Sequence, residues 1–189
     1  MSWVGAVMLA SAVLGANINC KSPGGWRMPL VGGPAMRVYV DPDARFHLEL
    51  PRDWSVVPQG PGAVVDFLAR SRREYRGDFR ENVNLLRLSF PARFSAEEVR
   101  EAHLNEIRGR YRRLRLVESG GLERRGAEPV PYAIIELPVA GVPLKDKIYY
   151  FMEGRQGSVL TCSARRGTFT RFEKIFDRIA ISFRSGRPN

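Results

Sequence analysis

Short apolar segments separated by tight turns restrict the fold of this chain more than any other feature of its sequence. The second half contains five such segments, with Gly- or Pro-containing turns between them: 114–119, 122–125, 132–137, 148–153 and 158–164. Runs of this length and composition are typical of β-strands. Parallel strands need crossover connections of a dozen or more residues, which tight turns do not supply. We therefore expect an antiparallel sheet.

Three further strands are predicted in the first half. Residues 46–50 alternate between apolar and polar side chains and stop at Pro51. A turn follows, and it delivers Trp54 to the core. The segments 63–69 and 82–90 are also rich in apolar residues. The economical arrangement is one sheet of six or seven strands, fewer than the eight candidate segments.

Two helices are predicted beside these strands. Ser95 and Glu98 have the spacing of a capping box, and the helix behind it should run to about Arg113. Its apolar stripe comprises Val99, Ala102, His103, Ile107 and Tyr111. The second helix should begin at Thr168 or Thr170, and its stripe comprises Phe169, Phe172, Ile175, Phe176 and Ile179. The economical arrangement is a single α+β domain with two main helices packed on one sheet.

The N-terminus carries an apolar run from Trp3 to Ala16, with no charged side chain before Lys21. A helix needs about 20 residues to span a bilayer, whereas this run has the length of a signal-peptide core. We expect a signal-peptide-like segment over 1–20, a Gly/Pro-rich tether over 21–37 and the folded domain over 38–185.

Two kinds of processing of this leader stay open, beside an uncleaved anchor or a chain that is not exported. Cleavage can follow Ala16, after small residues, or Cys20 can be the lipid-carrying cysteine of a bacterial lipoprotein. Asn17 and Asn19 are not the residues that a lipidation motif favours at their positions. The expected location is the cell envelope, either periplasmic or membrane-anchored, with secretion as the alternative.

No pattern of residues indicates catalysis. The chain has no Gly-rich phosphate-binding loop, and its two histidines and two cysteines are scattered without metal-ligand spacing. No Gly-x-Ser-x-Gly motif is present either. We expect neither enzymatic activity nor a cofactor nor a metal.

Basic residues are the feature that most suggests a binding surface. The formal net charge is +10, and 26 of the 30 basic residues are Arg. A GC-rich genome produces the same excess of Arg. No nucleic-acid-binding module surrounds the basic stretches, so nucleic acid is not the favoured partner. One polar segment carries aromatic residues among its arginines, and it is the candidate for contact with an acidic partner or anionic headgroups: Arg70, Arg72, Arg73, Tyr75, Arg76, Phe79 and Arg80.

Four motifs, in this order and spacing, resemble the PsbP/DcrB-like family of proteins. Residues 46–54 resemble its opening F-x-x-x-x-P-x-x-W, and residues 81–85 resemble its N-I-N-V strand. Residues 149–164 resemble a hairpin that ends in L-x-C-x-A, and residues 169–184 resemble the closing helix and strand. The resemblance implies an α/β/α sandwich with a central antiparallel sheet and no shared catalytic residues.

The resemblance also implies a non-enzymatic role, since family members include photosystem accessory subunits, a Ran-binding import factor, periplasmic lipoproteins and adaptors for secreted effectors. The expected function is therefore that of an envelope-associated (lipo)protein that serves as an accessory or binding module for another protein. One alternative is a pocket protein that carries a small apolar or anionic ligand. Another is a protein that binds polyanions or a membrane surface. The oligomeric state stays open.

Overall fold

A computed structural model describes residues 33–188, apart from 44, 61 and 73–78. The first half of the described chain holds five strands and one helix: β1 (Met36–Val40), β2 (Phe46–Pro51), β3 (Trp54–Val56), β4 (Phe67–Ser71), β5 (Asn82–Ser89) and α2 (Ala96–Arg110). The second half holds the remaining elements: β6 (Arg115–Arg124), β7 (Ala127–Val139), β8 (Val142–Glu153), β9 (Gln156–Arg165), α3 (Phe169–Ser182) and β10 (Arg184–Ser185).

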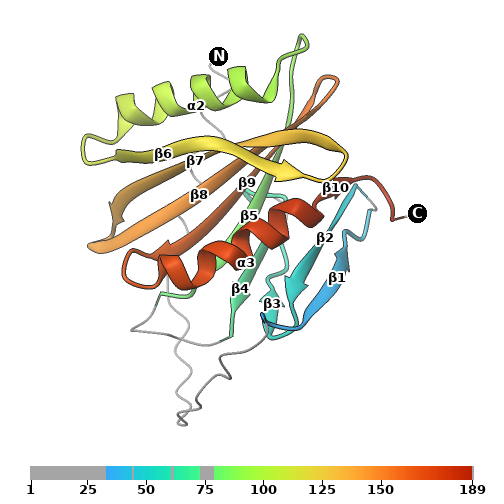
Figure 1. Ribbon diagram of the computed structural model, residues 1–189, viewed down its shortest axis with the longest axis horizontal. Helices are drawn as coiled ribbons and strands as arrows, with labels where there is room; N and C mark the ends of the chain where they lie inside the picture. The colour runs from blue at the N-terminus through green and yellow to red at the C-terminus, as the bar shows by residue number, and fades with distance from the viewer. Residues whose placement is uncertain (1–32, 44, 61, 73–78, 189) are drawn as a thin grey trace.

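The strands form two antiparallel sheets (Figure 1). The larger sheet has seven strands in the order β3-β4-β5-β9-β8-β7-β6, which confirms the expected antiparallel sheet of six to seven strands. The smaller sheet has three strands in the order β1-β2-β10 and was not expected as a separate sheet. It places the first and the last described strands on either side of β2.

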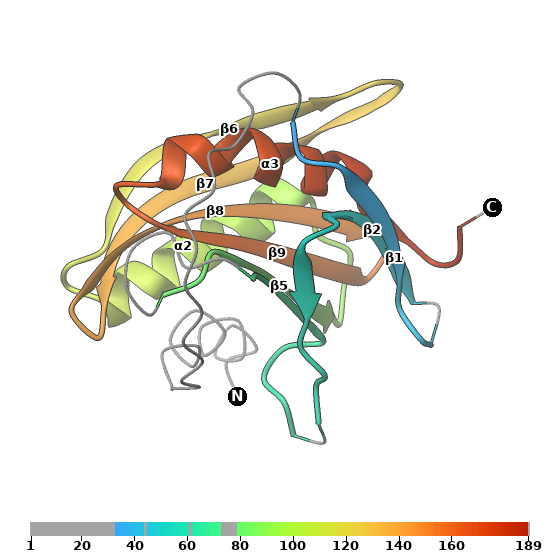
Figure 2. The ribbon, with the colours of Figure 1, turned by 90° about the horizontal axis from the view of Figure 1, so that it is seen from below.

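The large sheet lies between two layers (Figure 2). Because side chains alternate along a strand, each strand contributes to both layers. Val83 and Leu85 of β5 pack in the core that contains α3 and β2, whereas Leu86 packs on the opposite side with α2. The molecule is thus a single α+β domain with α2 on one face and α3 with the small sheet on the other, which confirms the α/β/α sandwich.

Both helices begin where the sequence indicated. The Ser95 side chain accepts a hydrogen bond from the Glu98 backbone, and the Glu98 carboxylate accepts one from the Ser95 backbone, which confirms the capping box. α2 ends at Arg110 rather than near Arg113. Thr168 occupies the N-cap of α3, but its hydroxyl donates to Glu81 (2.8 Å) instead of capping the helix.

Three strand boundaries differ from those expected. The two segments 114–119 and 122–125 are one long strand, β6, whose pairing with β7 shifts register at Leu116/Glu118 and Leu122/Arg124. The strand expected from Ala63 begins at Phe67. No strand was expected over Met36–Val40, where β1 pairs over its whole length with β2, so Met36 and Arg37 belong to a strand and not to the expected tether. Neither described helix is both long and apolar enough to cross a membrane.

Candidate functional site

The small sheet has a buried inner face and an exposed outer face. On β2, Phe46, Leu48 and Leu50 point inward and are completely buried. Val38 and Val40 of β1 lie on the outer face, opposite Glu49 and His47. Their side chains are 58% and 41% exposed, although both belong to a residue type that is usually buried.

The C-terminal turn of α3 continues this outer face. Ile181 is 40% exposed, and its carbonyl accepts a hydrogen bond from the Arg184 guanidinium (2.7 Å). Arg184 in turn lies opposite His47, so Val40, His47 and Arg184 form one row across the three strands.

The second row of this face ends in an ion pair. Val38 lies opposite Glu49, and the Glu49 carboxylate accepts from Arg178 Nε of α3 (3.1 Å). We call the surface formed by Val38, Val40, Ile181, Arg178 and Arg184 the aliphatic–arginine face. It holds three of the four large hydrophobic side chains that are exposed among the described residues; the fourth is Val117 of β6.

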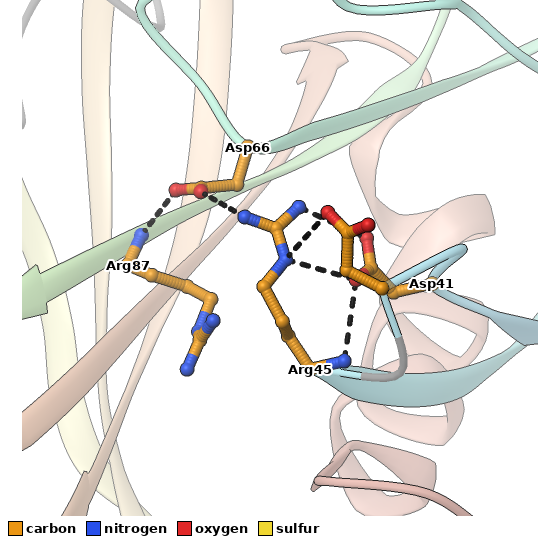
Figure 3. Close-up of polar contacts among 5 residues, drawn as sticks. Asp41, Arg45, Asp66 and Arg87 are labelled. Atoms are coloured by element: carbon orange, nitrogen blue, oxygen red, sulfur yellow. Dashed lines mark hydrogen bonds and ion pairs between the residues drawn. The ribbon is translucent and has the colours of Figure 1, made fainter.

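Arg45 fixes the small sheet against the large one (Figure 3). Its guanidinium donates to both carboxylate oxygens of Asp41 (2.9 and 3.1 Å) and to Asp66 (3.3 Å). Asp66 also accepts from the backbone N–H of Arg87 in β5 (2.8 Å). Burial favours a higher pKa for Asp41, but the hydrogen bonds from the side chain and backbone of Arg45 outweigh it and lower this pKa. We call these contacts the Arg45 clamp.

Lys147 fixes α3 on the large sheet. Its ammonium is almost fully buried and pairs with Glu173 (3.1 Å) and Asp177 (2.8 Å) of α3. Asp177 also accepts from the Tyr149 hydroxyl (2.7 Å), and the Lys147 ammonium lies 4.5 Å from the centre of the Tyr132 ring. Since β7, β8 and α3 all contribute, this network sets the position of the helix whose last turn carries Ile181.

Burial keeps two titratable side chains, His103 and Cys162, uncharged near neutral pH. Burial lowers the pKa of His103 to about 4, and its Nδ1 lies 2.7 Å from the Tyr150 hydroxyl. Burial also raises the pKa of Cys162 well above that of a free thiol, so this side chain is a thiol rather than a nucleophilic thiolate. In the part of the chain that the structure covers, no three His, Cys, Asp or Glu side chains group as metal ligands do.

The arginine-rich segment is only partly described. Arg70 lies at the end of β4, opposite Asn82 of β5, and Arg72 donates from Nε to the Ser55 hydroxyl (3.0 Å). The Arg80 carbonyl accepts from Asn82 (3.1 Å), and the side chains of Arg80 and Phe79 are half-buried. The residues Arg73, Tyr75, Arg76 and Cys20 lie outside the described residues. A binding role for this segment and lipidation of Cys20 therefore stay predictions.

Sequence reasoning missed the aliphatic–arginine face. Val38 and Val40 belong to an ordinary strand pattern, and their exposure depends on what the fold stacks against them. The one available signal was the run from Met36 to Val40, in which the β-branched valines flank a tyrosine without any Gly or Pro. Such a run predicts a strand, but it does not say which face of that strand is covered.

No family model matches the chain, and no curated protein matches its sequence. Solved structures with the same fold were found at low identity. Cyanobacterial PsbP (CyanoP) from Synechocystis superposes with a TM-score of 0.61 at 15% identity, over 85% of this chain and 98% of that one.

Two other similar structures come from distant organisms. LpqN of Mycobacterium tuberculosis, which is involved in cell envelope biogenesis, has a TM-score of 0.54 at 11% identity, over 80% of this chain and 91% of that one. The Ran-binding protein Mog1p of Saccharomyces cerevisiae has a TM-score of 0.57 at 5% identity, over 80% of this chain and 96% of that one. Identities this low establish the fold alone. The chain has a PsbP-like fold.

Proposed function

We propose that this chain is a non-catalytic accessory protein of the cell envelope and that it binds another protein through its aliphatic–arginine face. The observation that carries the proposal is the grouping of exposed aliphatic side chains beside two arginines. Val38 and Val40 are linked to α3 through their strand partners: Glu49, opposite Val38, pairs with Arg178. His47, opposite Val40, lies beside Arg184, which donates to the carbonyl of the exposed Ile181.

The composition of this face favours a protein partner. Arg is enriched at protein interfaces, where its planar guanidinium makes directed hydrogen bonds beside apolar contacts. A surface for anionic lipids needs unopposed positive charge, whereas Glu49 lies in the middle of this face and already pairs with Arg178.

The envelope location rests on the leader and on the comparisons. The apolar run over 3–16 has the length of a signal-peptide core. One protein with this fold, LpqN, is involved in cell envelope biogenesis, and another, Mog1p, binds Ran. These neighbours support an accessory role for the present chain without naming its partner.

A charged substitution on this face tests the proposal. We expect Val38→Glu and Ile181→Glu each to abolish recovery of the partner after chemical cross-linking in intact cells and purification of the full chain. The matched control is Val117→Glu, which changes a similarly exposed aliphatic residue on β6, away from this face. Far-UV circular dichroism and thermal unfolding would establish that all three variants fold.

Equal recovery of the same partner with wild type, Val38→Glu and Ile181→Glu would refute this face as the binding site. A partner lost only with Val117→Glu would move the site to β6. Recovery that depends steeply on salt, with nucleic acid or anionic lipid in place of protein, would instead support the polyanion alternative.

Anchoring through Cys20 is tested separately. We expect metabolic labelling with palmitate to mark the wild-type chain and not Cys20→Ala, and we expect the variant to move from the membrane fraction to the soluble fraction. Labelling that persists in Cys20→Ala, or no labelling of either chain, would exclude a lipid anchor at this residue.

A further inference from the structure

The backbone groups of Val38 and Val40 point away from the small sheet. The N–H of Asp41 donates to the carbonyl of Phe46 across β1 and β2 (3.0 Å), so these two residues form a hydrogen-bonded pair. Hydrogen-bonded and non-hydrogen-bonded pairs alternate along an antiparallel ladder. In the unbroken register between β1 and β2, Val38 and Val40 are therefore in non-hydrogen-bonded pairs, and their N–H and C=O groups face the outer edge.

This outer edge is free over the described residues. β1 is the terminal strand of the order β1-β2-β10, and it lies at the outside of the molecule in Figure 2. The same two valines thus expose both their side chains and their backbone hydrogen-bonding groups. The carbonyl of Met36, further along the edge, is already covered by Arg52 Nε (3.3 Å).

Both edge strands of the large sheet, β3 and β6, are protected against pairing with another strand, in contrast to Val38 and Val40 of β1. Proteins protect exposed edges with bulges, charged side chains and short strands. β6 has two register shifts and carries charged side chains along its length, among them Arg115, Glu118, Glu123 and Arg124. β3, at the opposite edge, has only three residues. β10, the other edge of the small sheet, has only two residues. β1 has no register shift, and Val38 and Val40 are aliphatic, so this stretch of its edge lacks these protections.

Charged side chains at the two ends of the β1 edge indicate which charges an incoming segment should carry. Arg37 and Arg52 are exposed beside the Met36 end, and Arg37 is held there by the Trp54 carbonyl (3.1 Å). Asp43, in the turn after Val40, lies 3.6 Å from Arg45 Nε but is 74% exposed, so it can also face an incoming segment. An incoming segment with an acidic residue at the first end and a basic residue at the second would complement both charges.

We propose that the partner of the aliphatic–arginine face adds an extended strand to the free edge of β1. This inference rests on the proposed protein-binding function and specifies its geometry. The added strand hydrogen-bonds to the N–H and C=O groups of Val38 and Val40. It places β-branched or aliphatic side chains against these valines, with an acidic residue near Arg37 and a basic residue near Asp43. In such β-augmentation, main-chain bonds supply affinity and the flanking side chains supply specificity.

A synthetic peptide probe tests the geometry on the full chain. The probe is a fluorescein-labelled decapeptide with two valines separated by one threonine, a glutamate at one end and a lysine at the other. The control peptide has the same sequence with N-methylated valines, which cannot donate hydrogen bonds. We expect fluorescence anisotropy to show binding of the first peptide, and at least tenfold weaker binding of the second.

Two substitutions at one position separate backbone from side-chain effects. Val38→Pro removes the outward N–H, and it leaves the pairing with β2 intact because that N–H does not bond to β2. Val38→Thr keeps both the N–H and the branched shape. We expect Val38→Pro to weaken binding at least tenfold and Val38→Thr by less than threefold, and we expect bound peptide to slow hydrogen exchange at the Val38 and Val40 amides.

Strand addition would be overturned by equal binding to wild type and Val38→Pro, by unchanged exchange at the two amides, or by no peptide binding up to millimolar concentration. Dimerisation of the free chain that Val38→Pro abolishes would assign the edge to a second copy instead. If the cellular partner is lost with Val38→Glu but retained with Val38→Pro, the binding face stands and only the strand geometry fails. If the partner is retained with both Val38→Glu and Val38→Pro, the proposed function itself is refuted.

Discussion

Asp146 should make the stability of this protein fall as the pH rises. Its carboxyl is completely buried on the α2 side of β8, opposite Ser163 of β9, and neither oxygen has a hydrogen-bond partner among the described residues. Burial raises its pKa to about 7, against a smaller opposing effect of the nearby Ser163 hydroxyl. A carboxyl with a raised pKa is most stabilising when protonated, so its contribution is full at low pH and is lost as the pH rises through the folded-state pKa.

The magnitude follows from the difference between the two pKa values. The folded value of about 7 lies roughly three units above the ordinary value of 3.8. At about 1.4 kcal/mol per unit, ionisation costs about 4 kcal/mol in total. The cost begins near the ordinary pKa, reaches most of its value by neutral pH and levels off above it.

The assay is urea unfolding followed by tryptophan fluorescence between about pH 4 and pH 8. Asp146→Asn removes the ionisable group at nearly constant volume. We expect the stability of this variant relative to wild type to grow by about 4 kcal/mol across this range, whatever the difference is at pH 4. The control Glu153→Gln changes an exposed carboxylate on the same strand and should follow the wild-type profile. Parallel profiles for wild type and Asp146→Asn would refute the reasoning.

Three further substitutions test the ion pairing and the packing of the fold. Arg45→Ala should destabilise the protein by about 1–3 kcal/mol, because it leaves the buried Asp41 carboxylate unpaired. Because the pKa of Asp41 is lowered in the folded state, its ion pair with Arg45 stabilises the protein above the unfolded-state pKa of the carboxyl. The destabilisation by Arg45→Ala should therefore shrink as the pH falls. A destabilisation independent of pH would contradict this reasoning. Gly157→Ala should destabilise the protein by about 1–3 kcal/mol, since the new Cβ would lie 2.6 Å from Phe90 Cε2. Gly109→Ala, in open space on α2, should instead stabilise it by about 0.5–1 kcal/mol. Thermal unfolding measures both effects, and equal effects would refute the packing argument.

The strands and turns of the large sheet could be predicted because each depends on the pattern of a few neighbouring residues. The capping box at Ser95 and the Gly-containing turn between β8 and β9 depend on neighbours in the sequence. The sequence predicts two strands in place of β6 because Gly120 and Gly121 look like a turn. In the structure they stay in the ladder opposite Tyr132 and Pro131. Pairing with β7 therefore overrides the local preference of the two glycines.

The small sheet and the candidate site could not be predicted in the same way. β1 owes its position to pairing with β2, which in turn pairs with β10 from the far end of the domain. Nothing near Val38 in the sequence says that α3 will cover the inner side of β2 and leave the outer side open. Lys147 and Asp146 also look like surface residues in the sequence, yet both are buried. Their positions follow from the two-sided packing of the sheet, which a pattern of period two does not reveal.

The structure also changes what the excess of arginine implies. Among the described residues, several guanidinium groups donate hydrogen bonds to backbone carbonyls, including those of Arg37, Arg52, Arg124, Arg155 and Arg184. Arg155, for example, satisfies the carbonyl of Phe90 at the end of β5 (3.0 Å). A carbonyl at the end of a strand has lost its ladder partner, and a fork of several donors is well suited to replace it. The net charge of +10 thus includes groups with a structural task. Charge alone does not select a polyanion as the partner, and the exposed valines of β1 are the more specific guide to what this protein binds.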